Sequence, residues 1–338
     1  MTNKTLIDIM ELENIITSAL VSSNTSQRNA ILVSKALVEA EIDGKLGHGI
    51  SRVESYCLQS KSGKVNGLAV PKIKKLKPGV LSIDANFGFA YPALEEVIKK
   101  LPIISEKQGI AMAGVFNSNH FGVAGRFVEK IANAGKISII FGNTPSAIAP
   151  WKGKIPLFGT NPIAFGAPLL NGKHLVIDLA VSRVARGKIL KAYQLGEKIP
   201  FGWALDEYGQ PTDNPELALK GTMLPFGDAK GSALALMIEI LAAAVTGANF
   251  AFEADSFFTS EGSPPSVGQM VIMIDPGCMK NKENVLNRIS EILFLMSNQE
   301  DVYIPGSKRF DLRNKALENG LLVESVTLEL IKNLNKKN

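Results

Sequence analysis

Two of the three histidines in this chain stand at points where a titratable ring could do chemistry. His48 lies between Gly47 and Gly49. Arg52 follows four residues later, so a helical segment would place His48 and Arg52 on one face. A ring that can donate a proton, beside a guanidinium that can grip a carboxylate, suits chemistry on a small carboxylic acid. The same spacing suits a surface histidine and an arginine in a salt bridge, and both interpretations stay open.

His120 follows the strand-like run IAMAGVFN and precedes the helix-like run RFVEKIANAG. In α/β proteins ligands collect at the carboxyl ends of strands, and the backbone N–H groups of residues 122–125 could bind an anion at a helix N-terminus. The alternative is a histidine that caps its own turn.

Asp178 ends the apolar run HLVID. A carboxylate at the end of a buried strand is costly unless it is paired, and a histidine or a cofactor hydroxyl could be the partner. The alternative is an aspartate that caps a helix or turn. His174, in the polar turn NGKH, is interpreted as structural.

Three further segments could bind ligand oxygens. Thr160 lies in the loop-like run LFGTNPIAFGAP, and Lys230 stands just before a long apolar segment. A lysine near a helix N-terminus indicates an anion site, because a cation there is locally unfavourable without one. Ser307, Lys308 and Arg309 form a cluster of the kind that grips a phosphate. Each segment is equally compatible with an ordinary loop or basic turn.

The pattern of apolar residues predicts an α/β protein with helices at both ends. Helical periodicity covers residues 6–42, with a break at SSNTS where Thr25 or Ser26 would cap the second helix. Strands are expected at PKIKKLKP, VLSIDA, IAMAGVFN, ISIIFGN, PIAFGAP, HLVIDLA and QMVIMIDP. Further helices are expected at residues 92–109, 126–135, 231–247, 283–295 and 312–334. Packing of the terminal helices together would give a discontinuous helical domain, residues 1–110 and 280–338, around a ligand-binding domain, residues 111–279.

Composition narrows the class of protein. The chain has 338 residues, of which 46% are hydrophobic and 20% charged, which is typical of a globular protein. A net charge of +5 without an aromatic-interleaved basic patch argues against nucleic acid as a partner. The apolar run at residues 231–247 contains Glu239 and is shorter than the ~20 residues a membrane span needs, so it is expected to be a buried helix. The N-terminus does not resemble a signal peptide, and two cysteines without metal or redox spacing suggest a reducing compartment, the cytoplasm.

Familiar short motifs are absent. The sequence has no strand followed by G-x-G-x-x-G, no P-loop, no G-x-S-x-G and no cluster with metal-ligand spacing. The order of GHGISR, NSNHFG, GTNPIAFGAP, IDLAVSRVARGKI, PFGDAKGSALALMIEILAAAVTGANF and IPGSKR nevertheless resembles the malate/L-lactate dehydrogenase family that lacks a classical Rossmann fold. The resemblance covers essentially the whole chain and is closest to the Δ1-piperideine-2-carboxylate/Δ1-pyrroline-2-carboxylate reductases.

The resemblance implies a nicotinamide-dependent homodimer with a mixed-sheet cofactor domain. In the imino-acid reductases the histidine matching His48 is taken as proton donor, supported by the aspartate matching Asp178; in malate-type members the residue matching His120 has that role. Arg52 and Thr160 would bind substrate. The residues that would line the cofactor are His120, Phe121, Gly122, Val123, Ala124, Asp178, Leu179, Ala180, Arg186, Gly187, Ala229, Lys230, Pro305, Gly306, Ser307, Lys308 and Arg309.

Three positions depart from the family pattern. Gly47 replaces the usual serine, so a proton relay through that serine cannot operate. Asp228 replaces a glycine, where a carboxylate facing the cofactor would oppose the 2′-phosphate of NADP, and Val181 stands where threonine is common. The cations Lys230, Lys308 and Arg309 favour NADPH, with NADH as the alternative.

The function expected from these residues is reduction of a cyclic imino acid. The first alternative is dehydrogenation of a 2-hydroxy acid such as malate, lactate or ureidoglycolate on the same scaffold. The second is a binding protein without activity, which the changes at Gly47 and Asp228 suggest.

Overall fold

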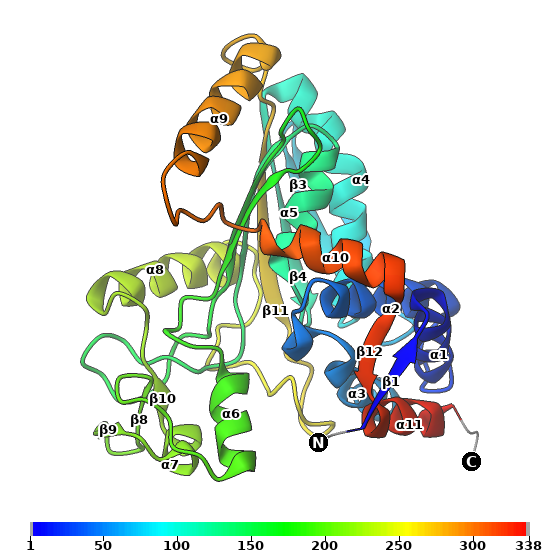
Figure 1. Ribbon diagram of the computed structural model, residues 1–338, viewed down its shortest axis with the longest axis vertical. Coiled ribbons are helices and arrows are strands. Elements are labelled where there is room, and N and C mark those ends of the chain that lie inside the picture. Colours follow the sequence, from blue (N-terminus) through cyan, green and yellow to red (C-terminus); the bar gives the residue numbers. More distant parts are fainter. Residues whose placement is uncertain (1–2, 336–338) are drawn as a thin grey trace.

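The structure is a computed structural model that describes residues 3–335, so residues 1–2 and 336–338 of the predicted helical domain lie outside the described residues. A seven-stranded sheet in the order β2-β3-β4-β11-β5-β6-β7 runs through the molecule (Figure 1). Its strands are β2 (Lys72–Lys77), β3 (Val80–Asp84), β4 (Ile110–Ser118), β5 (Ile137–Gly142), β6 (Ile163–Ala167), β7 (Leu175–Leu179) and β11 (Val267–Ile274). β3 and β4 are parallel and the other neighbours antiparallel, so the predicted mixed sheet is confirmed.

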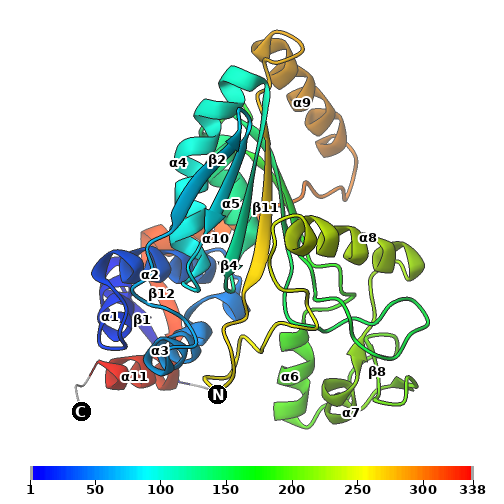
Figure 2. The ribbon, with the colours of Figure 1, turned by 180° about the vertical axis from the view of Figure 1, so that it is seen from behind.

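Two hydrophobic cores lie on opposite faces of this sheet. Alternate residues of β11 point to opposite sides, as the pleat of a strand requires: Val271 joins the core shared with α4 and α5, and Met270 joins the core shared with α8. Figure 2 shows β11 between the α4 side and the α8 side. The helices in this layer are α4 (Ala90–Gln108), α5 (Ala124–Asn133) and α8 (Ala229–Glu239), which continues as the π-helical η3 (Ile240–Ala244).

The two ends of the chain lie together. Strand β1 (Lys4–Ile7) pairs antiparallel with β12 (Leu321–Glu324), and the adjoining helices share the α4-side core. These are α1 (Ile9–Val21), α2 (Gln27–Ile42), α3 (Val53–Ser62), α10 (Lys308–Asn319) and α11 (Ser325–Leu334), with the 3-10 turns η1 (Leu46–His48) and η2 (Ile50–Arg52) before α3. The division into two domains at residue 110 stays a prediction; the sheet itself crosses that position, because β2 and β3 precede it.

A second lobe lies on the α8 side of the sheet (Figure 1). It contains α6 (Arg186–Leu195), α7 (Pro215–Lys220) and a small sheet of β8 (Ala204–Leu205), β9 (Pro211–Thr212) and β10 (Thr222–Met223). The remaining helix, α9 (Lys282–Ser297), follows β11.

Most predicted elements are present, and the following details needed correction. The single helix expected at residues 312–334 is broken, because Gly320 takes a positive φ of 76° and β12 then pairs with β1. The apolar helix expected to be buried exposes Leu236, Met237 and Ile240 on its outer face. Helices α3, α6 and α7 and the short strands β1, β8, β9 and β10 were not predicted.

Candidate active site

The structure brings the two candidate histidines together. His48 Nδ1 lies 3.2 Å from His120 Nε2, and the two ring planes are within 14° of each other. His48 ends the turn η1, and His120 is the second residue after β4, as expected for a ligand site at a strand end. The two residues are 72 positions apart in sequence, and the stretch between them includes α3, β2, β3, α4 and β4, which is why no local motif could reveal the pair.

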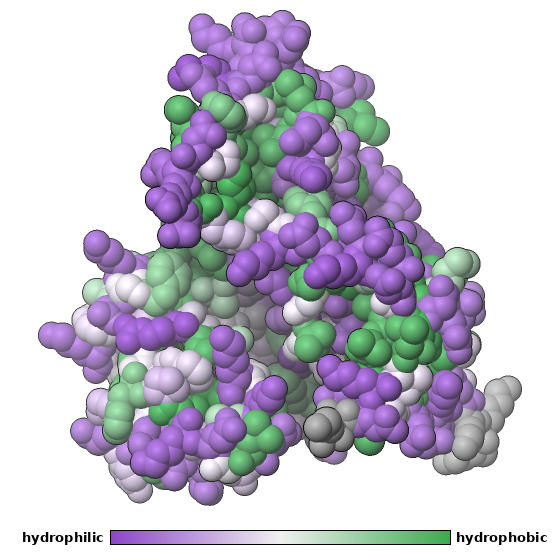
Figure 3. Space-filling model, viewed as in Figure 1, coloured by the Kyte–Doolittle hydropathy of each residue, from purple (hydrophilic) through white to green (hydrophobic). Residues whose placement is uncertain are grey.

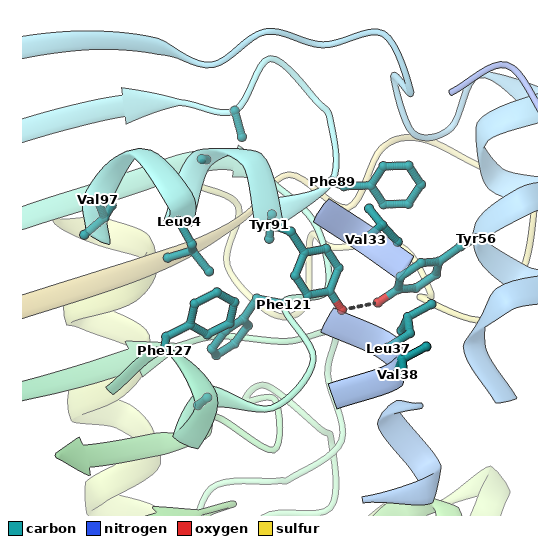
Figure 4. Close-up of a cluster of buried hydrophobic side chains, with 14 of the residues drawn as sticks. Val33, Leu37, Val38, Tyr56, Phe89, Tyr91, Leu94, Val97, Phe121 and Phe127 are labelled. Atoms are coloured by element: carbon teal, nitrogen blue, oxygen red, sulfur yellow. Dashed lines mark hydrogen bonds between the residues drawn. The ribbon is translucent and has the colours of Figure 1, made fainter. Parts of the chain in front are cut away.

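The pair continues into the core through two tyrosines that the sequence analysis missed. The hydroxyl of Tyr56 lies 2.6 Å from His120 Nδ1 and 3.1 Å from the hydroxyl of Tyr91. Tyr56 comes from α3 and Tyr91 from α4, and Figure 4 shows their hydroxyl groups meeting inside the hydrophobic core. Both side chains are buried among apolar neighbours, so in the sequence they resemble ordinary core aromatics.

Burial and neighbouring cations keep both histidines neutral. Burial, together with the positive charges of Arg52 and Lys45, lowers the pKa of His48 to about 4. Burial, then Arg52 and His48, holds the pKa of His120 well below its usual range. At neutral pH each ring therefore has one nitrogen that accepts a hydrogen bond and one that donates.

Arg52 lies beside this pair with the end of its guanidinium free. Its Nε donates to Gly47 O at 2.8 Å, and its guanidinium carbon lies 4.4 Å from the centre of the Phe258 ring. Within residues 3–335 neither terminal nitrogen of Arg52 has a hydrogen-bond partner, and neither is fully buried. The free end of the fork is the part that grips a carboxylate.

A loop at residues 256–261 covers the histidine and the arginine, and α3 fixes that loop. Phe257 packs against His120 at 5.3 Å between ring centres. The Gln59 side chain donates to Phe257 O at 2.7 Å, and Lys64 Nζ donates to the carbonyl oxygens of Ser256, Thr259 and Glu261. These contacts hold both phenyl rings over the site, a role that no sequence pattern suggested for Lys64.

Asp178 does not bond to either histidine in the structure. Its Oδ2 accepts the backbone N–H of Gly125 at 2.9 Å, at the start of α5, which is the helix-capping alternative. Burial raises its pKa, with Gly125 and Lys45 opposing that shift. The Gly125 N–H is thereby occupied, so it is not free for a phosphate. A catalytic part for Asp178 stays a prediction.

The turn from His120 to Ala124 is largely packed into the core. Phe121 and Ala124 are buried, and Gly122 has a φ of 69° with Tyr91 Oη 2.7 Å from the point where a Cβ would lie. Only glycine fits this approach of the turn to Tyr91. Val123 is half-buried.

The other predicted cofactor residues divide into open and occupied positions. Leu179, Ala180, Gly187, Ala229 and Lys230 are exposed, as are Ser307 and Lys308 at the start of α10, and Pro305 and Gly306 are half-buried. Arg186 donates to Leu219 O at 3.0 Å. Arg309 is buried, and its guanidinium lies 3.5 Å from Glu129, so its charge is already paired.

Asp228, the carboxylate expected to oppose NADPH, has a partner of its own. It forms an ion pair with Arg183, a residue that the sequence analysis did not single out, and both side chains are exposed. The pair places one cation and one anion where the family pattern has a glycine.

Thr160 makes no hydrogen bond to the histidines. Its N–H donates to Thr144 Oγ1 at 2.9 Å, and the two hydroxyl groups are 3.3 Å apart. The next residue, Asn161, donates to the buried carboxylate of Glu239, which anchors the loop to α8. Substrate binding by Thr160 stays a prediction. His174 is structural as expected, since it accepts from Leu169 N–H and pairs with Asn133.

Figure 3 shows the surface hollowed between the lobe that carries α6, α7 and α8 and the lobe that carries α2 and α3. The open positions fit a long ligand. No atom lies within 4 Å of the point where a Cβ would stand on Gly187 or Gly227, and the buried Ser182 hydroxyl has no partner within residues 3–335.

No group of three His, Cys, Asp or Glu side chains in the described chain could hold a metal ion, and none of its helices is long and apolar enough to span a membrane.

Comparison with known proteins matches residues 7–332 to the malate/L-lactate dehydrogenase model. The chain belongs to the malate/L-lactate dehydrogenase family. It is therefore an NAD(P)-dependent oxidoreductase, and the resemblance seen in the sequence is confirmed.

Individual relatives span nearly the whole chain. It is 42% identical to the (2R)-3-sulfolactate dehydrogenase (NADP(+)) of Chromohalobacter salexigens, over 96% of this chain and 97% of the relative. It is 34% identical to the Δ1-pyrroline-2-carboxylate/Δ1-piperideine-2-carboxylate reductase of Pseudomonas putida, over 97% and 96% of the two chains. The crystal structure of Δ1-piperideine-2-carboxylate reductase from Pseudomonas syringae superposes with a TM-score of 0.91 at 34% identity, covering 98% of this chain and 99% of that one.

Proposed function

We propose that this dehydrogenase interconverts a 2-hydroxy acid that carries a second anionic group and the corresponding 2-oxo acid, with NADP(H) as cofactor. The observation that carries the proposal is a neutral His48 flanked by two cations, Arg52 and Lys45, which both lower its pKa. One cation can hold the carboxylate, and the second can balance a sulfonate or carboxylate at the other end of the substrate. The relative that acts on sulfolactate supports this class.

The residues divide the work of oxidation as follows. The free end of Arg52 holds the substrate carboxylate, and Phe258 keeps the guanidinium in place from its other face. His48, neutral at pH 7, takes the proton of the hydroxyl group at its Nε2 atom, since its Nδ1 is occupied by His120. A bound nicotinamide cofactor would supply the acceptor for the hydride. In the opposite direction the same nitrogen returns the proton.

Reduction of a cyclic imino acid, the function first expected from the sequence, is the second candidate. The relatives from two Pseudomonas species support it. An imino acid has one anionic group, so it would use Arg52 and leave Lys45 without a substrate charge.

A substrate panel read at the nicotinamide absorbance band decides between the candidates. We expect the highest kcat/KM with 3-sulfolactate or malate and NADP, a low value with lactate, and a low value for reduction of Δ1-pyrroline-2-carboxylate. Lys45→Met should raise KM for the doubly anionic acids about tenfold and leave that for lactate unchanged. A higher kcat/KM with the imino acid, insensitive to Lys45→Met, would establish the second candidate. No turnover of any substrate despite NADPH binding would favour the inactive binding protein.

NADPH is proposed over NADH because Asp228 is neutralised by Arg183, while Lys230 and Lys308 are exposed. Asp228→Asn removes the carboxylate and leaves Arg183 free to meet the 2′-phosphate. We therefore expect this variant to raise the ratio of kcat/KM with NADPH to kcat/KM with NADH by a few-fold. Asp213→Asn, which breaks an exposed pair with Lys198, is the matched control and should leave the ratio unchanged. A falling ratio in Asp228→Asn would show that Asp228 holds a ribose hydroxyl, and would favour NADH.

We also propose that the enzyme is a homodimer, as the resemblance implied, and that it is cytoplasmic, as its cysteines suggested. Light scattering of the purified protein measures its mass directly, and a monomer mass across the concentration range of the assay would refute the dimer. Fractionation of the source cells tests the location.

A further inference from the structure

Four side chains form one continuous line of hydrogen bonds from the surface into the core. In order they are His48, His120, Tyr56 and Tyr91, joined by contacts of 3.2, 2.6 and 3.1 Å. His120 is 6% exposed and Tyr56 is 2% exposed, so neither can exchange its partner for bulk water. Within residues 3–335 the Nδ1 atom of His120 has no partner other than Tyr56.

Such a line has only two possible polarities, because each neutral imidazole carries one N–H. If Tyr56 donates to His120 Nδ1, the proton of His120 must be on Nε2, where it donates to His48 Nδ1; the proton of His48 is then on Nε2. In the second polarity His120 donates from Nδ1 to the Tyr56 oxygen, so its Nε2 carries no proton and accepts from His48. His48 then carries its proton on Nδ1, and its Nε2 is unprotonated.

Only the second polarity lets His48 act as a base. The proposed function requires Nε2 of His48 to accept a proton from the substrate, so this inference rests on that function. Protonation at Nε2 then leaves the Nδ1–H bond to His120 undisturbed. In the first polarity Nε2 is already protonated, and the ring has no free lone pair for the substrate.

We propose that Tyr56 is a positioning residue whose oxygen accepts the Nδ1 proton of His120 and so fixes the tautomers of both histidines. In this arrangement the hydroxyl of Tyr56 donates to the oxygen of Tyr91 across the 3.1 Å contact that Figure 4 marks with a dashed line. Tyr56 thus acts on His48 through His120, by determining which ring nitrogen of each histidine carries the proton.

The surroundings of the two tyrosines support this assignment. Burial raises the pKa of Tyr56 to about 12, so its oxygen keeps its hydrogen and can accept one bond and donate another. The Tyr91 hydroxyl is buried beside Tyr56, where it can accept that bond.

The tautomers can be observed without any substrate. Nitrogen NMR of protein labelled in histidine distinguishes protonated from bare ring nitrogens, and with three histidines in the chain a His174→Gln variant assigns the third. At neutral pH we expect both His48 and His120 to carry the proton on Nδ1. Protons on Nε2 of both rings would overturn the proposal, whatever the substrate proves to be.

Tyr56→Phe tests the cause. Loss of the acceptor should move the His120 proton to Nε2 and invert His48 with it. The expected result is a fall in kcat of about a hundredfold, with KM for NADP and the melting temperature near the parent values. Tyr208→Phe, at an exposed tyrosine, is the matched control. Unchanged tautomers in Tyr56→Phe, with any loss of kcat tracking a loss of stability, would reduce Tyr56 to a packing role and refute the inference. If Tyr56→Phe inverts the tautomers of His48 and His120 but the parent protein turns over no hydroxy acid, the proposed function would be refuted instead.

Discussion

His48→Gln is expected to lower kcat by a hundred- to ten-thousandfold, the usual range for loss of a general acid or base, while NADPH affinity stays near the parent value. The physical reason is that His48 is the half-buried, neutral end of the histidine pair, whose Nδ1 already bonds to His120. Its Nε2 is the nitrogen left for a substrate proton. Steady-state rates and fluorescence of bound NADPH measure the two quantities separately.

The matched control is His174→Gln. This histidine bonds to Leu169 and Asn133 far along the chain from the pair, so its loss should leave kcat unchanged. Because His48 and His120 act as one unit, the double variant should lose little more than the worse single variant. Parent-like turnover in His48→Gln would move the proton transfer elsewhere, and His120 would then be the next candidate.

Candidate site residues were predictable where a reactive side chain stands at a position in the chain that favours ligand binding. His48 and Arg52 stand close in sequence, and His120 follows a strand, so their types and places alone suggested a site. The pairing of His48 with His120 was not predictable from spacing, because it depends on η1 packing against the end of β4. The family resemblance named both histidines as alternatives, whereas the structure makes them partners.

The supporting residues were hidden for a different reason. Tyr56 and Tyr91 have the burial of core side chains, and only the position of their hydroxyl groups separates them from their neighbours. Lys64 has a sequence context typical of a surface lysine, yet its ammonium group is enclosed by three carbonyl oxygens of the loop over the site. Contacts made across almost 200 residues leave no pattern in a single sequence.

The ends of the chain and the lobe at residues 186–223 were predicted less well than the central sheet. Most strands of the sheet are short apolar runs bounded by turn residues, and their length and flanking residues favour strands. Strand β1 has only four residues and three of them are exposed, so nothing but its pairing with β12 defines it. The basic turn at Ser307 to Arg309 looked like a phosphate site because its three residues are polar neighbours in sequence. The structure separates them: Lys308 is exposed, and Arg309 turns to Glu129.

Arg52→Lys is expected to raise KM for the substrate by about tenfold to a hundredfold and to change kcat little. Lysine keeps the positive charge, but it loses two features that the structure shows for Arg52. One is the Nε bond to Gly47 O together with the flat face against Phe258, which orient the side chain. The other is the pair of free terminal nitrogens that can bind both oxygens of one carboxylate. Hydrogen bonds to a charged group contribute about 1.5–3 kcal/mol, which sets the expected range.

Initial rates over a range of hydroxy-acid concentrations, at saturating NADP, measure both constants. Arg288→Lys, at an exposed arginine paired with Glu291, is the matched control and should leave both unchanged. Because the carboxylate contact is present in the bound substrate and in the transition state alike, its loss belongs in KM, and kcat should not follow it. An unchanged KM in Arg52→Lys would place the carboxylate elsewhere, with Lys45 as the remaining cation beside His48. A fall in kcat at constant KM would instead mean that Arg52 acts only in the transition state, by stabilising charge that develops on the substrate oxygen.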